Sequence, residues 1–237
     1  HVISFDGQIP QFEQALGGQF QQPVKIKALH VALVPTPHLR FEGVSIGAAG
    51  QIQVPTVKAA GALGSLFGDR KSFKGIELNA PVISEEGLGW ILFGQRQARD
   101  VPFGDVSAVG ASLDSKRVAL PAFDAKIQFD ESGAWKSISL ATADKNLEAQ
   151  LVAKGAAAEV EIRARSFKVP FGSALTLEDF AANGKADKGG LTLSEFKGFL
   201  FGGMLGGNAR LTWGDAWTLS GEATARQIDT ARLIPDL

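Results

Sequence analysis

The sequence predicts a mainly β, β-rich α+β fold: one long curved antiparallel sheet with two or three short helices, groove-like or sandwich-like in form. Apolar and polar residues alternate with a period of two over much of the chain, the pattern of strands with one dry face. Short turn signals separate the alternating runs, so successive strands form hairpins. Segments with helical spacing are too few to cover a sheet of roughly ten strands or more at the usual strand length.

The expected strands follow this alternation. In the first part of the chain they are residues 24–33, 39–46 and 51–54, punctuated by Pro35 and Pro37. The clearest alternation lies at residues 158–165, where apolar side chains alternate with glutamate and arginine, and residues 125–130 and 147–153 follow the same rule. Turn signals lie at residues 130–133, 143–146, 183–190 and 214–215, the last between two tryptophans.

The expected helices are short. Residues 10–19 form the first, because Phe12, Leu16 and Phe20 fall on one helical face. Residues 56–66 form a second, with Thr56 as a plausible N-cap, and residues 228–233 a third.

The chain 1–237 is interpreted as a single β-rich domain. Pro102 and Gly104 interrupt the alternation, so sub-regions 1–100 and 105–237 are expected to share one sheet.

One stretch raises a question about what covers the sheet. In residues 201–225 the dry face shrinks along the chain from Trp217 and Leu219 to Gly221, Ala223 and Ala225. A sheet with one apolar face must pack that face against something. Two interpretations remain open: a sandwich whose facing strands carry the larger side chains, or a curved sheet whose hollow holds acyl chains.

Composition excludes several classes of function. Lys and Arg total 24 against 25 Asp and Glu, so no net field attracts nucleic acid, and no nucleic-acid partner is expected. There is no cysteine, which removes disulfides, thiolate nucleophiles and zinc–cysteine sites. No apolar run approaches the ~20 residues of a spanning helix. The chain begins at His1 without a signal-peptide pattern, so we expect a processed or cut-out piece.

No catalytic, metal or cofactor site is expected, and the chain is interpreted as non-enzymatic. Residues 64–72 have the wrong spacing for a phosphate loop, and the glycines at 202, 203, 206 and 207 are explained as hairpin turns. His30 and His38 lack partners at metal-ligand spacing. The carboxylate pairs at 85–86 and 178–179 are interpreted as solvated turns. Of the four tryptophans, taken as core residues, Trp213 and Trp217 flank a turn and could clasp across it.

Several motifs in order resemble one family over most of the chain. Residues 201–213 (FGGMLGGNARLTW), then 217–221 and 228–234, are similar to the carboxyl-terminal repeat of AsmA-like proteins, with its glycine-rich turn and tryptophan-led strand. Residues 12–26 and 35–46 resemble the segment after the membrane anchor of that family. Residues 64–78 resemble its helix and following strand.

The resemblance implies a periplasmic domain on an inner-membrane anchor upstream of His1, in a Gram-negative envelope. The family is similar to repeating-β-groove proteins, so phospholipid or another acyl-chain ligand is implied as the partner, bound or transferred between the inner and outer membranes. The alternative is an interaction or regulatory module that assists outer-membrane protein or envelope assembly. The chain is too short for a groove that spans the periplasm. The apolar groove face is expected to include Ile127, Phe129, Leu147, Leu151, Val160, Ile162, Leu211, Leu219, Gly221 and Ala223.

Overall fold

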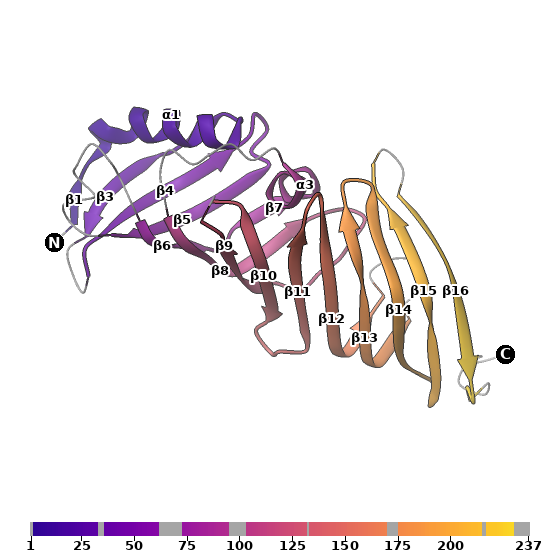
Figure 1. The fold of residues 1–237 in the computed structure, drawn as a ribbon. Coiled ribbons are helices and arrows are strands. Elements are labelled where there is room, and N and C mark those ends of the chain that lie inside the picture. Colours follow the sequence, from indigo (N-terminus) through magenta and orange to yellow (C-terminus); the bar gives the residue numbers. More distant parts are fainter. Residues whose placement is uncertain are drawn as a thin grey trace. The chain divides into compact units, whose positions relative to one another are not determined.

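The computed structural model describes residues 2–32, 36–61, 73–94, 103–131, 133–169, 175–214 and 217–229. The fold class is confirmed, because these residues form one long, mostly antiparallel sheet of sixteen strands with two α-helices and a short 3₁₀ helix (Figure 1). β1 and β16 stand at the two ends of the strand order, so the sheet is not a closed barrel.

The chain divides into two compact units. Unit 1 comprises residues 1–116 and 120–138, and unit 2 comprises residues 117–119 and 139–237. Both described α-helices belong to unit 1, and the described regular elements of unit 2 are strands.

Unit 1 contains nine complete strands and the described helices. The elements are β1 (Val2–Ser4), η1 (Asp6–Gln8), α1 (Ile9–Phe20), β2 (Val24–Lys25), β3 (Ala28–Ala32), β4 (His38–Ile46), β5 (Ile52–Ala60), β6 (Phe73–Asn79), β7 (Val82–Ser84), α3 (Glu85–Phe93), β8 (Phe103–Asp114) and β9 (Phe123–Phe129), and β10 (Trp135–Thr142) begins there. The ladders β6–β8 and β7–β8 are parallel. A helix-containing crossover, here with α3 between β7 and β8, allows the chain to return in the same direction.

The expected first helix is confirmed as α1, which lies across β3, β4 and β5 (Figure 1). Phe12 is buried, and its ring meets Phe41 edge to face with centroids 5.0 Å apart. Leu16 packs on the same core cluster. Phe20 was expected on this face but is 41% exposed, because it ends the helix just before Gln21 turns left-handed.

Helix α3 corrects the interpretation of Glu85 and Glu86 as a solvated turn. Both carboxylates lie in its first turn, where negative charge is favoured, and Ser84 Oγ caps the Gly87 N–H at 3.1 Å. The helix lies tight against the start of β5, since a Cβ on Gly87 would come within 2.7 Å of the Gln51 carbonyl oxygen. The capping serine and Gly87 therefore fix its start and its packing.

Three other expectations about unit 1 and the C-terminal end need correction. Residues 56–60, the start of the helix expected at 56–66, instead continue the strand expected at 51–54 as part of β5, because β5 pairs on both sides with β4 and β6. Residues 62–66 lie outside the described residues. The single strand expected at 24–33 is two strands, β2 and β3. Ile228 and Asp229 are not helical, and residues 230–233 of the third expected helix lie outside the description.

Unit 2 is an antiparallel meander of strands that follow one another in chain order (Figure 1). They are β11 (Leu147–Lys154), β12 (Ala157–Lys168), β13 (Thr176–Asp187), β14 (Gly190–Leu200), β15 (Gly203–Thr212) and β16 (Thr218–Arg226). The turn expected at 143–146 is confirmed. β15 and β16 pair antiparallel around the turn expected at 214–215, of which Asp215 lies outside the described residues.

The turn expected at 183–190 is wrong in extent. β13 continues to Asp187, whose carboxylate accepts the N–H groups of Gly189 at 2.7 Å and Gly190 at 3.1 Å. In this strand the side chains alternate: Ala182 and Ala186 are buried on the apolar face, and the polar residues between and after them are exposed on the other face.

Two further expectations placed turns where the structure has strand. Glu178 and Asp179 lie within β13 at a bulge, with Asp179 at φ +48°. Gly202 lies in the β14–β15 turn as expected, but the glycines at 203, 206 and 207 belong to β15.

Candidate apolar binding face

The pairing registers of unit 2 align an apolar face across six strands. Directly paired residues of an antiparallel ladder point to the same side of the sheet. Three rows of paired residues therefore share this apolar face: Ala153, Ala158, Ala186, Leu191, Leu211, Leu219; Leu151, Val160, Gly184, Leu193, Ala209, Gly221; and Ala149, Ile162, Ala182, Phe196, Gly207, Ala223.

The structure brings most of the expected site residues together. Those on the apolar face are Leu147, Leu151, Val160, Ile162, Leu211, Leu219, Gly221 and Ala223; Leu147 extends it through its pairing with Ala164. Ile127 and Phe129 are separate, because they lie on β9 in unit 1, where Ile127 pairs with Val106. Both are half-buried.

The expectation omitted the middle of the face. β13 and β14 contribute Ala182, Gly184, Leu193 and Phe196, which join the rows of β12 to those of β15. Gly184 was missed because residues 183–190 carry a strong turn signal, which also hid the strands on both sides of it. The alternation of Ala182, Gly184 and Ala186 was the available sign of a strand.

Burial decreases along the apolar face toward β16. Val160 and Ala182 are 7% and 4% exposed, whereas Leu219 is 55% exposed. Phe167 and Phe180 stack with centroids 4.3 Å apart and join the buried cluster around Ala182. The face is thus closed over β12 and β13 and open at β16.

The shallow relief of β15 and β16 has a backbone cause. A Cβ on Gly207 would lie 1.9 Å from the Glu222 carbonyl oxygen, and one on Gly221 would lie 2.3 Å from that of Asn208. These glycines therefore allow close approach of two strands and also leave room above them.

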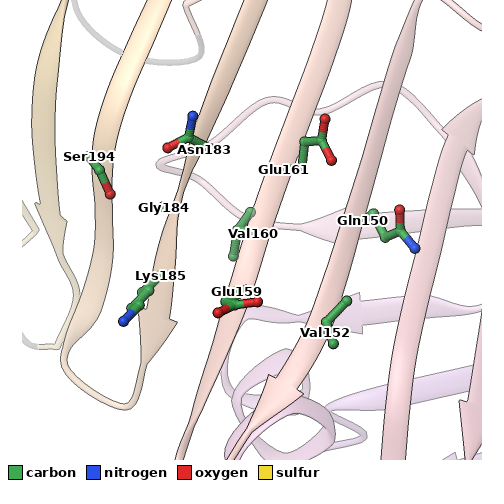
Figure 2. A pocket seen from close by; sticks show the side chains of 9 residues that line it. All are labelled: Gln150, Val152, Glu159, Val160, Glu161, Asn183, Gly184, Lys185 and Ser194. Carbon is green, nitrogen blue, oxygen red and sulfur yellow. The ribbon is translucent and has the colours of Figure 1, made fainter.

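The opposite face of the same sheet is polar and hollowed. A cavity of about 460 Å³ is lined by Gln150, Val152, Glu159, Glu161, Asn183, Lys185 and Ser194, and it is also bordered by Val160 and Gly184, which belong to the rows of the apolar face (Figure 2). The register shift between Leu193 and Phe196 falls at the cavity wall, where Ser194 lies opposite no single residue of β13. Lys154 Nζ lies 3.8 Å from Glu159, and Arg163 contacts Glu161, so both carboxylates already have cationic neighbours.

The two tryptophans beside the β15–β16 turn meet as their positions predict. The rings of Trp213 and Trp217 are 6.2 Å apart, tilted by 51°. Trp213 Nε1 donates to the Lys188 carbonyl oxygen at 2.9 Å, and the Arg117 guanidinium lies 5.8 Å from the Trp217 ring. The two rings thus contact each other, the β13–β14 turn through Lys188, and Arg117.

Titratable groups in the described residues form no evident reaction centre. No group of three His, Asp or Glu side chains there could hold a metal ion. His30 Nε2 lies 3.9 Å from Glu42, and His38 Nδ1 is 2.8 Å from the Thr36 carbonyl oxygen. The Leu29 N–H and the Ser4 hydroxyl lower the pKa of Asp6, and the Thr142 hydroxyl and Asn146 N–H lower that of Asp144.

Comparisons with family models, with curated proteins and with solved structures gave no match. Of the helices in the described ranges, none is long and apolar enough to cross a membrane.

Proposed function

We propose that this chain is a non-enzymatic lipid-binding protein that holds acyl chains on the apolar face of unit 2 and carries or passes phospholipid in envelope biogenesis. The observation that carries the proposal is the six-strand apolar face, which is buried at Val160 and opens toward Leu219. A contiguous apolar face that is exposed to water commonly marks a surface that binds a ligand or a partner.

The dimensions suit an acyl chain. Six strands at a spacing of about 4.8 Å span roughly 24 Å across the sheet. Each methylene group removed from water contributes about 0.8 kcal/mol, so partial burial of one chain supports stable binding. The small residues of β15 and β16, Gly207 and Ala223 among them, leave space for it beside larger Phe196.

The resemblance to AsmA-like proteins supplies the proposed setting. Residues 201–213, which carry the strongest motif, form the β14–β15 turn, β15 and Trp213. On this reading the protein works in the periplasm, held to the inner membrane by an anchor upstream of His1, with phospholipid as its partner.

Lipid extraction and native mass spectrometry of the purified chain test the proposal. We expect phospholipid in a defined stoichiometry in the parent protein. Leu219→Asp should lower lipid occupancy severalfold while the fold survives, because Leu219 is already 55% exposed. Ser220→Asp, one residue on and directed to the other face, is the matched control and should retain lipid. A parent protein without lipid, both as purified and after incubation with phospholipid vesicles, would contradict the proposal.

The second candidate function is an interaction module that assists envelope assembly. The observation that favours it is β16, a nine-residue strand at the end of the strand order whose residues are all exposed. Only a carrier should hold phospholipid in fixed stoichiometry, so the same mass measurement separates the two.

A further inference from the structure

β16 has the features of a docking edge. It pairs with β15 over nine residues without a register shift, and every one of those residues is exposed. At the other end of the strand order, β1 is only three residues long. A short strand is one of the ways by which proteins protect a sheet edge, and β16 does not use it.

The sequence of β16 also lacks three further features that protect sheet edges, namely lysine, proline and a bulge. TLSGEATAR contains no lysine or proline, and its ladder with β15 has no bulge. Among the strands that the structure describes, none pairs with the outer side of β16, so its alternate N–H and C=O groups can receive a further strand, the arrangement used in β-strand addition.

Its two charged residues point to the occupant. Glu222 and Arg226 lie on the polar face of β16, four residues apart and both exposed. In the part of the chain that the structure describes, neither has an ion-pair or hydrogen-bond partner. Within the described residues this strand therefore carries two opposite charges without partners, at the spacing that an antiparallel copy of itself would match.

We infer that β16 pairs with β16 of a second copy of this chain, antiparallel, about a two-fold axis at Thr224. This axis sets Glu222 of each copy opposite Arg226 of the other. It also sets Ala223 opposite Ala225, which keeps small apolar side chains on one face. An axis at Glu222 would instead place two carboxylates directly opposite each other, which is destabilising.

The consequence is a sheet that continues from one copy into the next. The apolar face of unit 2 would then double in width, because Ala223 and Ala225 lie on it at the edge. The pairing itself uses only backbone groups and two ion pairs, so it stands or falls independently of lipid binding.

Disulfide trapping tests the axis directly, because the chain has no cysteine and each variant therefore carries one thiol. Under mild oxidation Thr224→Cys should give a covalent dimer. Thr192→Cys, an exposed position on β14, controls for random collision and should stay largely monomeric. Faster trapping of Glu222→Cys than of Thr224→Cys would overturn the axis.

Charge exchange tests the partner. Sedimentation equilibrium should show a concentration-dependent dimer of the parent chain. Arg226→Glu or Glu222→Arg should each weaken it about tenfold, since two attractive pairs become repulsive, and the double exchange should restore it. Melting temperatures, which these exposed changes should leave nearly unchanged, verify folding. A parent that stays monomeric at high concentration, or a double exchange that restores nothing, would overturn the inference.

Discussion

The side-chain amide of Asn146 pairs with both backbone groups of Ser166: Nδ2 donates to the Ser166 carbonyl oxygen at 2.7 Å, and the Ser166 N–H donates to Oδ1 at 2.9 Å. The pairing of β11 with β12 begins at Leu147, which lies opposite Ala164. The Asn146 side chain therefore continues the hydrogen-bond ladder beyond the first residue of β11. Arg165 Nη2 adds contacts to the carbonyl oxygens of Asp144 and Lys145 at 3.2 and 3.3 Å. The turn that enters β11 is thereby fixed to β12.

Removing this clamp should destabilise unit 2 modestly. Asn146→Ala loses both hydrogen bonds and should lower the free energy of unfolding by about 1–2 kcal/mol. Asn146→Asp keeps the acceptor for the Ser166 N–H but replaces the donor that faces the Ser166 carbonyl oxygen by a second oxygen, which is repulsive, so its effect should be at least as large. Urea denaturation followed by tryptophan fluorescence measures both. Gln150→Ala, on the same strand, should change stability by no more than about 0.5 kcal/mol, and an equal loss there would contradict a specific role for Asn146.

The same turn should respond to acid through Asp144. Its Oδ1 accepts the Thr142 hydroxyl at 2.6 Å and the Asn146 N–H at 2.9 Å, which lower the pKa of this carboxyl in the folded state. A lowered folded-state pKa gives stability that is present above the unfolded pKa of about 3.9 and is lost as pH falls through the folded pKa.

Asp144→Asn should therefore reduce the acid sensitivity of unfolding. The loss of unfolding free energy between about pH 5 and about pH 2.5 should be smaller in the variant than in the parent. Asp6, whose pKa is lowered in the same direction, is unchanged in both proteins and cancels in the comparison. Identical pH profiles for parent and variant would show that the Thr142 and Asn146 contacts do not favour the ionised carboxyl.

Adjacent glycines of β15 should differ in their tolerance of a side chain. Gly207→Ala would bring Cβ within 1.9 Å of the Glu222 carbonyl oxygen, and it should cost about 1–3 kcal/mol because β15 and β16 must separate. Gly206→Ala meets its nearest atom, the Phe196 carbonyl oxygen, at 3.2 Å and should cost less. Chemical denaturation of the two variants checks the order, and equal losses would argue against close strand approach at Gly207.

A charge on the apolar face should have opposite consequences at its two ends. Val160 is 7% exposed, so Val160→Asp buries an unpaired carboxylate and should cost several kcal/mol. Leu219→Asp stays in contact with water and should melt within a few degrees of the parent. Ile162→Asp, at a half-buried position beside Ala182, should fall between them. Thermal melts followed by circular dichroism give the ranking, and collapse of Leu219→Asp would mean that β16 is part of a closed core.

The sequence by itself determined the fold class and most strands of unit 2. Alternation over 158–165 places Val160 and Ile162 on one side of β12, and the period of two is a local property that needs no knowledge of the neighbours. The spacing of Phe12 and Leu16 likewise predicted α1. For the same reason the expected residues on β11, β12, β15 and β16 lie on one face.

Tertiary pairing decided the rest. Val57 lies in β5 because its neighbours β4 and β6 offer ladders on both sides, which outweighs a helical spacing weakened by glycine. Gly184 belongs to a strand rather than a turn because it pairs with both Val160 and Leu193. Long-range packing also decides where the apolar face is closed and where it is open. Phe180 stacks on Phe167 at one end, whereas Leu219 at the other end is exposed. The alternation of apolar residues in the sequence is the same at both ends, so the sequence alone cannot distinguish a buried apolar residue from an exposed one.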